Sequence, residues 1–240
     1  MNLLAEMSWA EVEEYLAKDD RIILPLGSTE EHGRHLGLGT DSIEAEAIAR
    51  GAGEQTNVIV APTLHYGMAL SQMGFPGTVS LKPMTLMAVL EDIFCSLYRH
   101  GFRRVLVVNG HGGNTASLMS AIHTIAQDLI GLRVKSFEWW TDQEAYRVVV
   151  EMLGEQTGSH ASPGETAFML AVQPNAVKLD RLTGRDAPVK PSREIITVQT
   201  FAQKYPDGIM GLDPRHATSE VGAALLKKSA EICVREINDW

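Results

Sequence analysis

The chain has 240 residues, of which 45% are hydrophobic and 21% are charged, a composition typical of a globular protein with a sizeable core. Its formal net charge of -9 at pH 7 argues against nucleic acid as a partner, because phosphate contacts need clustered Lys and Arg. No early segment is organised as a signal peptide, and no run approaches the roughly 20 apolar residues that span a bilayer. We therefore expect a cytoplasmic protein without a membrane partner. Cys95 and Cys233 fall in helix-like segments and are expected to be buried thiols rather than a disulfide.

Short apolar runs alternate with amphipathic segments along most of the chain. In chain order, the pattern predicts a helix from residue 8, a strand at 21–26, a helix from 41, a strand at 57–62, an extended segment at 78–81, a helix at 85–100, a strand at 104–110, a helix at 114–129, a strand at 132–137, a helix at 142–153, a helix from 162 and a last helix at 218–238. Residues 173–214 contain several prolines and are expected to be irregular. Strands that alternate with helices predict an α/β fold with a largely parallel sheet, in which ligands bind beyond the carboxyl ends of the strands.

A glycine-rich segment, GSTEEHGRHLGLGTD, follows the first predicted strand and concentrates acids and histidines. Glu30 and His32 are two residues apart, so in an extended chain both side chains lie on one face and can reach one site. Glu31 then points to the opposite face, and Glu30 is the preferred ligand. Asp41 is either a further ligand or the N-cap of the next helix, and His35 is either a ligand or a solvent-facing residue.

A second polar segment, VNGHGGNTAS, follows the most apolar predicted strand. His111 lies directly beyond that strand, where parallel sheets bind their ligands, and Asn114 can cap the following helix. A competing interpretation is a dinucleotide-binding loop, with Glu138 after the next strand as its acidic residue. The required G-x-G-x-x-G spacing fails, because Thr115 occupies the place of the third glycine, so this interpretation is disfavoured.

A third polar segment, GSHASPGETAFML, leads into another predicted helix. Ser162 and Glu165 fit a capping box with Pro163 at the first helical position, which gives Glu165 a purely structural explanation. His160 lies two residues before this cap, on a loop that can close over a site.

The three segments together offer imidazole and carboxylate groups, which suit Zn, Mn or Fe as metal ligands. Two such ions, held roughly 3.5–4 Å apart by a bridging carboxylate, acidify a shared water and polarise a carbonyl oxygen. The residues therefore favour a hydrolytic metal centre.

These segments, together with GLDPRHATSEVG at residues 211–222, occur in an order and spacing that resemble the creatininase, or creatinine amidohydrolase, family. The likeness extends from the first predicted strand to the final helix. The resemblance implies a three-layer α/β/α fold, a single domain over residues 1–240, and a pair of divalent ions that opens a cyclic amide or a related C–N bond. It also implies a small-molecule substrate and a homo-oligomer, often a hexamer built from dimers.

Carried over to this chain, the resemblance makes Glu30 and His32 ligands of different metal ions. Asp41 would bridge the two ions, and His111 would complete the site of Glu30. A hydroxide between the ions would then attack the carbonyl carbon of the substrate.

In creatinine-cleaving members of the family, a glutamate two residues after this histidine binds the second ion, and that position is Gly113 here. The chain therefore resembles a sister branch with GHGGN, in which Glu165 supplies the missing carboxylate. His160 matches a family histidine that contacts the substrate or transfers a proton. His160 and Glu165 are accordingly the residues expected to take part in catalysis.

Departures from the creatinine-cleaving members leave the substrate open. The tryptophan that precedes the family histidine by four positions is Gln156 here, and Trp139 or Trp140 can replace part of that aromatic wall. Other members cleave formamides, process a modified peptide or hydrolyse an oxidised inositol ring. The leading hypothesis is a metal-dependent amidohydrolase acting on a small cyclic amide or formamide. The alternatives are the hydrolysis of a cyclic diketone and a catalytically inactive metal-binding scaffold.

Overall fold

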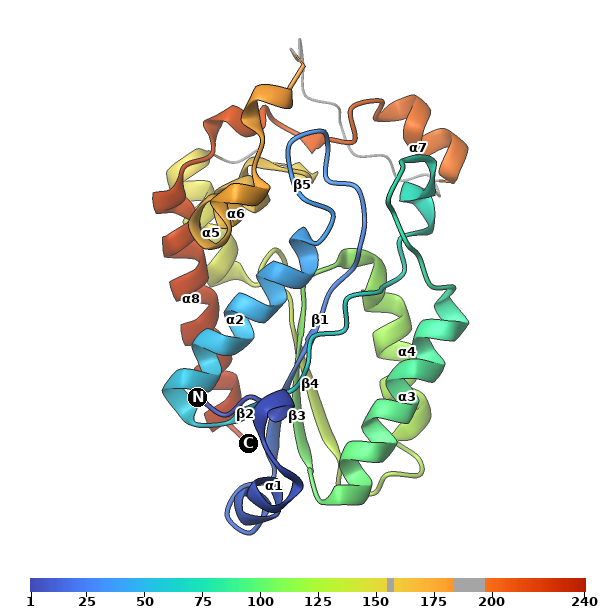
Figure 1. Ribbon diagram of the computed structural model, residues 1–240, viewed down its shortest axis with the longest axis vertical. Helices are drawn as coiled ribbons and strands as arrows, with labels where there is room; N and C mark the ends of the chain where they lie inside the picture. Colours follow the sequence, from blue (N-terminus) through green and yellow to red (C-terminus); the bar gives the residue numbers. More distant parts are fainter. Residues whose placement is uncertain (155–157, 184–196) are drawn as a thin grey trace.

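A parallel four-stranded sheet forms the centre of the protein, whose computed structural model describes residues 1–154, 158–183 and 197–240 (Figure 1). Its strands are β1 (Arg21–Leu26), β2 (Ile59–Val60), β3 (Arg104–Asn109) and β4 (Arg133–Phe137). They lie in the order β2-β1-β3-β4, and each neighbouring pair is parallel. The predicted α/β class with a parallel sheet is confirmed.

Helices cover both faces of the sheet and complete three layers (Figure 1). One face carries α2 (Thr40–Thr56), α5 (Gln143–Leu153), α6 (Pro163–Val172) and α8 (Ser219–Asn238). The other face carries α3 (Pro83–His100) and α4 (Thr115–Ile125). The short helix α1 (Trp9–Leu16) lies at the end of the molecule where the strands begin. The expected three-layer α/β/α architecture is therefore present.

The alternation of side chains along each strand explains why both faces are covered. In β1, Ile23 packs into the core on the side of α2 and α8, whereas Ile22 packs into the core on the side of α3 and α4. In β3, Leu106 joins the first of these cores, and Val105 and Val107 join the second. Because these strands are apolar on both faces, each needs a helical layer on both sides.

Besides a shorter β2 (predicted at 57–62) and an earlier end of α4 (predicted at residue 129), the secondary structure differs from the prediction mainly in two regions. Residues 78–81 do not join the sheet; the backbone N–H of Val79 instead donates to the carbonyl oxygen of Thr29 (2.9 Å) in an isolated antiparallel bridge. The proline-containing region expected to be irregular includes α7 (Val198–Lys204) and a two-residue strand, β6 (Met210–Gly211). This strand pairs antiparallel with β5 (Gly158–His160) and brings the late part of the chain beside the third polar segment.

Two simpler expectations concern the cysteines and the membrane. Both cysteines are free thiols, but Cys95 is exposed on α3 and only Cys233 is buried, so the expectation of two buried thiols is wrong for Cys95. Cys95 lies on the outer face of an amphipathic helix, away from the sheet. Across the described ranges, no helix is both long enough and apolar enough to cross a membrane.

The carboxyl edge of the sheet gathers the polar segments. The chain leaves both β1 and β3 at this edge, and the first turns of α2 and α6 lie near it (Figure 1). These adjacent strands and helix starts allow side chains from distant parts of the chain to meet above the sheet.

Candidate metal centre

Glu30 and His32 follow β1, and both side chains are completely buried. The backbone N–H of Glu30 donates to the carbonyl oxygen of Leu38 (2.9 Å), which folds the glycine-rich segment back on itself. Nδ1 of His32 lies 3.2 Å from the carbonyl oxygen of Glu30, and a carbonyl only accepts, so Nδ1 carries the proton of this contact. In the neutral ring, Nε2 of His32 is then the nitrogen available to a metal ion.

Asp41 lies in the first turn of α2 and faces two histidines. The N-cap of this helix is Gly39, so the alternative that Asp41 caps the helix is wrong. Oδ1 of Asp41 lies 2.9 Å from Nε2 of His32, and Oδ2 lies 3.3 Å from Nδ1 of His111. One carboxylate thus presents a separate oxygen to each histidine, which is the arrangement that a bridging ligand needs.

His111 follows β3 and reaches the same cluster from the other side. Its Nε2 lies 3.2 Å from Oε2 of Glu30 and 2.9 Å from the carbonyl oxygen of Met68. Its backbone N–H donates to Oδ1 of Asn109 (3.2 Å), which anchors the residue to the end of the strand. The His111 ring therefore has one nitrogen near Glu30 and the other near Asp41.

Asn114 joins the loops that carry these residues. It occupies the N-cap position of α4 but its side chain makes no capping bond, contrary to the expectation. Oδ1 of Asn114 instead accepts from the backbone N–H of Met68 (2.9 Å), and Nδ2 donates to the carbonyl oxygen of Gly27 (3.0 Å). The amide is used to hold three segments in register rather than to start a helix.

Glu165 serves both its helix and the cluster. Its Oε2 accepts from the backbone N–H of Ser162 (2.8 Å), and Oγ of Ser162 accepts from the backbone N–H of Glu165 (3.4 Å), which confirms the capping box of α6. The other oxygen, Oε1, lies 3.6 Å from Nε2 of His32. Burial raises the pKa of Glu165, but its interaction with the neighbouring His32 imidazole outweighs burial and lowers this pKa to about 2. The carboxylate is therefore ionised at neutral pH.

The donor atoms converge closely enough to hold metal ions. Within the described parts of the chain, three sets have ligand atoms that lie within 4.8 Å of one another: Glu30, Asp41 and His111; His32, Asp41 and Glu165; and Glu30, His32 and His160. Oε1 of Glu30, Nε2 of His32 and Oδ2 of Asp41 are buried and make no hydrogen bond of proper geometry. An unsatisfied buried polar atom costs about 1–3 kcal/mol, so this convergence fits divalent cations as the missing partners.

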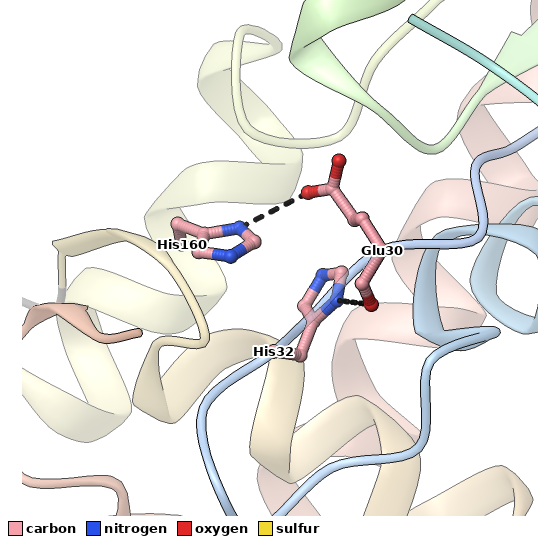
Figure 2. A group of neighbouring side chains, drawn as sticks. All are labelled: Glu30, His32 and His160. Atoms are coloured by element: carbon pink, nitrogen blue, oxygen red, sulfur yellow. Dashed lines mark hydrogen bonds and ion pairs between the residues drawn. The ribbon is translucent and has the colours of Figure 1, made fainter. Parts of the chain in front are cut away.

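His160 lies against this cluster from β5, with its ring beside that of His32 (Figure 2). Nδ1 of His160 lies 3.4 Å from Oε1 of Glu30, and the two imidazole centroids are 4.5 Å apart. Burial and the charge of His32 lower the pKa of His160, but Glu31 and Glu30 outweigh them and raise it to about 9. Cations bound among these carboxylates would oppose that rise, because they cancel the negative charge that favours the imidazolium.

Glu31 departs from the cluster as the alternation predicts, but it does not reach solvent. It is buried, and its Oε1 lies 3.0 Å from Nε2 of His160. The opposite face of the extended segment is thus covered by the third polar segment. The alternation of side chains along the extended segment predicts the face on which Glu31 lies, but it does not predict which residue contacts Glu31 there.

His35 is completely buried, so the alternative that it faces solvent is wrong. Its Nε2 lies 2.9 Å from Oγ1 of Thr166, whose hydroxyl donates to the carbonyl oxygen of Ser162 (2.8 Å). Nε2 of His35 therefore donates to the threonine oxygen and braces the first turn of α6. Burial is the main cause that lowers the pKa of His35 to about 4, and the charge of His32 adds to it.

His35 is expected to make the folded protein lose stability as the pH falls from 6.5 towards about 4. In this window the unfolded chain binds a proton on the ring and the folded chain does not, so the free energy of unfolding decreases, by about 3 kcal/mol at most. Urea unfolding at neutral pH and near pH 5 measures the loss. His35→Gln should lose less stability on acidification, whereas the exposed-residue control His123→Gln should behave as wild type. An equal loss in His35→Gln and wild type would contradict this prediction.

A cavity of about 440 Å³ opens onto the donor cluster. Its walls include the donors Glu30, Asp41, His111, His160 and Glu165, together with Gln72, Trp140, Tyr146, Ser159 and Met210. Trp140 is therefore the candidate tryptophan that lines the cavity, whereas Nε1 of Trp139 donates to Oε2 of Glu44 (3.0 Å) behind it. The two indole rings pack edge to face, 5.8 Å apart. Gln156, at the position of the family tryptophan, lies outside the described residues.

Sequence reasoning missed several residues around the site. Glu44 is buried one helical turn after Asp41, and burial raises its pKa well above the ordinary value. Glu44 is three residues after Asp41, and this spacing predicts that the two side chains lie on the same face of α2. Gln72 and Tyr146 carry no comparable signal, because their contribution depends on how η2 (Leu70–Gly74) and α5 fold over the cavity.

A comparison with protein-family models matches residues 5–237 to the creatininase family, described as creatinine amidohydrolase. Among curated proteins, the creatinine amidohydrolase of Pseudomonas putida is 28% identical over 98% of this chain and 94% of its own length. The mycofactocin precursor peptide peptidase of Mycolicibacterium smegmatis is 30% identical over 91% of this chain and 85% of its own. A 3-dehydro-scyllo-inosose hydrolase of Thermotoga maritima is 29% identical over 70% of this chain and 55% of its own.

Solved structures agree with the sequence comparisons. A creatininase described as the Mn form superposes with a TM-score of 0.87 and 27% identity, covering 99% of this chain and 97% of that chain. A creatininase variant of the Zn-Zn type gives the same TM-score of 0.87 and identity of 27%. The chain belongs to the creatininase (creatinine amidohydrolase) family and is an enzyme of that class, a metal-dependent hydrolase acting on non-peptide C–N bonds.

Proposed function

We propose that this enzyme hydrolyses the C–N bond of a small cyclic amide or formamide at a centre of two divalent ions. The observation that carries the proposal is the position of Asp41, whose two oxygens face His32 and His111 separately. Around this shared carboxylate, Glu30 and His111 complete one set of donors. In the assignment that we propose, these residues hold the first ion.

The second ion would be held by His32, Asp41 and Glu165. Glu165 has one oxygen in its capping box and the other directed at His32, so it can bind an ion without releasing the helix. This supports the idea that the third polar segment supplies the carboxylate that Gly113 lacks. The ions would be Zn, Mn or Fe, because imidazole and carboxylate donors suit all three.

Two bound divalent ions would supply Lewis acidity that polarises the substrate carbonyl and acidifies the attacking water. His160 lines the cavity and has Nδ1 directed at the cluster, so we assign it the proton transfer. Nδ1 takes a proton from the water as the new C–O bond forms and returns it to the nitrogen as the C–N bond breaks. The reaction consumes one water and yields a carboxylic acid and an amine, which remain in one molecule when the amide is cyclic.

The cavity suits a small substrate without a negative charge. Its walls carry three carboxylates of the donor cluster and, among the described residues, no Lys or Arg. No lysine or arginine among the described lining residues is thus available to pair with a phosphate or carboxylate, whereas Trp140 and Tyr146 offer aromatic faces to a flat or cationic ring. The same metal chemistry can act on a cyclic diketone, and the similarity to an inosose hydrolase keeps that reaction as the second candidate. We further propose that residues 1–240 form one domain and that the chain forms a homo-oligomer.

Metal content and hydrolysis, measured on wild type and His111→Ala, test the proposal. Protein purified without added metal is analysed for metal by elemental analysis. It is then incubated with creatinine, an N-formyl amine and a cyclic diketone, with mass spectrometry used to detect the gain of one water or the release of formate. We expect His111→Ala to lose at least one ion and nearly all turnover, because the ring contacts both Glu30 and Asp41.

The control is His123→Ala, which removes an exposed histidine of the following helix and should retain both properties. Unchanged metal content and activity in His111→Ala would overturn the proposed centre. Metal binding without hydrolysis of any probe would instead favour the inactive scaffold. Turnover of the diketone alone would favour the second candidate.

A further inference from the structure

We propose that Glu31 is a positioning residue that fixes the orientation and tautomer of His160, so that Nδ1 of His160 faces the reacting groups. This inference rests on the proposed function, because it concerns the histidine to which proton transfer is assigned. Neither the sequence motifs nor the family resemblance assigns a role to Glu31.

The Glu31 carboxylate is held independently of the donor cluster. Its Oε1 lies 3.0 Å from Nε2 of His160, and its Oε2 accepts from the backbone N–H of Gly33 (2.9 Å). The backbone N–H of Glu31 donates to Oγ1 of Thr78 (3.1 Å). With both carboxylate oxygens and the main chain engaged, Glu31 has little freedom to leave His160.

The segment before β6 closes over this carboxylate. A Cβ added at Gly208 would lie 1.9 Å from Oε2 of Glu31, and Gly208 has a φ of +75°, which favours glycine. The backbone at Gly208 thus packs directly on the carboxylate and allows no side chain between them. The Glu31–His160 contact is enclosed on this side by main chain rather than by mobile side chains.

The contact selects one tautomer of the neutral imidazole. A carboxylate only accepts hydrogen bonds, and Nε2 of His160 makes the shorter, hydrogen-bonded contact, 3.0 Å to Glu31, whereas Nδ1 lies 3.4 Å from Glu30. In the neutral ring, with Glu30 engaged by an ion, the proton is therefore on Nε2 and Nδ1 keeps its lone pair. Nδ1 is the nitrogen directed at Oε1 of Glu30, on the side of the donor cluster (Figure 2). Without Glu31, nothing in the described contacts of Nε2 would favour this tautomer.

Aromatic packing fixes the plane of the His160 ring, but it does not determine which ring nitrogen faces the donor cluster. The ring of His32 lies on one side, with centroids 4.5 Å apart, and Phe201 meets it edge to face at 6.1 Å. These contacts restrict the ring plane but do not distinguish the two nitrogens. The hydrogen bond to Glu31 supplies that distinction.

Removing the outer carboxylate behind a metal-ligating histidine typically costs 10–100-fold in activity or metal affinity, and we expect a loss of similar size at His160. Glu31 contacts none of the proposed metal ligands through its carboxylate, so we expect the loss in kcat rather than in metal content. Glu31→Ala should lower kcat by about 10–100-fold with KM and the number of bound ions nearly unchanged. Glu31→Gln keeps an oxygen that can accept from Nε2 and should recover part of the loss.

The decisive readout is the tautomer of His160 itself. Imidazole ¹⁵N NMR spectra of the zinc-loaded protein show which nitrogen is protonated, and His160→Gln identifies the signal by its absence. We expect a proton on Nε2 in wild type and a mixture of tautomers in Glu31→Ala. Thermal melting checks that the variants are folded, and Glu46→Ala on the outer part of α2 is the matched acidic control.

A proton on Nδ1 in wild type would overturn the inference, as would the wild-type tautomer and kcat in a folded Glu31→Ala. A wild-type protein that binds no metal or turns over no probe would contradict the proposed function instead. In that case the tautomer measured in wild type and Glu31→Ala still decides whether Glu31 positions the ring. The two failures are therefore distinguishable.

Discussion

Replacing Glu165 with alanine is expected to lower the metal content from two ions per chain to one and to abolish most turnover. Oε1 of Glu165 is directed at Nε2 of His32, and without it only His32 and the shared Asp41 remain for the second ion. The first set of donors, Glu30, Asp41 and His111, is left intact. Elemental analysis of metal per chain, together with kcat on whichever probe the wild type hydrolyses, measures both effects.

Ser162→Ala is the matched control for this change, because Glu165 also closes the capping box of α6. Loss of the Ser162 side chain should cost about 1 kcal/mol of stability, the usual effect of removing an N-cap, and leave both ions bound. If Ser162→Ala lost an ion as readily as Glu165→Ala, the role of Glu165 would be that of a helix cap alone. Two ions retained in Glu165→Ala would exclude it as a ligand.

Introducing glutamate at position 113, where creatinine-cleaving relatives are expected to carry it, should damage the site rather than restore a ligand. A Cβ at Gly113 would lie 2.3 Å from Nε2 of His111 and 2.3 Å from the carbonyl oxygen of Met68. The His111 ring would have to move away from Glu30 or the Met68 segment would have to shift. We expect Gly113→Glu to lose metal and to be destabilised by about 1–3 kcal/mol, as is usual for overpacking.

The neighbouring glycine offers a control for this substitution. A Cβ at Gly112 meets no atom within 4 Å, so Gly112→Ala should leave stability and metal content unchanged. Gly113→Ala separates the steric effect of Cβ from the effect of the added carboxylate. A fully stable Gly113→Glu with two ions would show that the loop relaxes readily and that both ligand layouts are compatible with this backbone.

Glu165→Ala and Gly113→Glu together test how the ligand set of this chain, with its GHGGN motif, differs from that of the creatinine-cleaving members. The close approach of Gly113 to His111 and to Met68 leaves no room for a side chain at position 113. A carboxylate for the second ion then has to come from elsewhere, and Glu165 is directed at the cluster from the start of α6. The ligand layout is therefore tied to backbone packing as well as to residue identity.

The amino-acid sequence was sufficient to predict the fold class and the edge of the sheet at which the candidate site lies. Apolar runs alternating with amphipathic segments predicted the parallel sheet, and local capping signals predicted the starts of α1 and α6. The i, i+2 spacing of Glu30 and His32 indicated that both would face one site. Periodicity succeeds here because it reports which face of an element each side chain occupies.

Which groups meet across those faces depends on the packing of segments that are far apart in the sequence. Glu31 is bonded to His160, 129 residues away, and His35 is bonded to Thr166, 131 residues away. The spacing of residues in the sequence predicted no partner for Glu31 and allowed His35 to face solvent. In the structure both side chains are buried. A buried polar side chain is stable only when a partner satisfies it, and that partner is brought into place by the packing of α6 and β5 over the loop after β1.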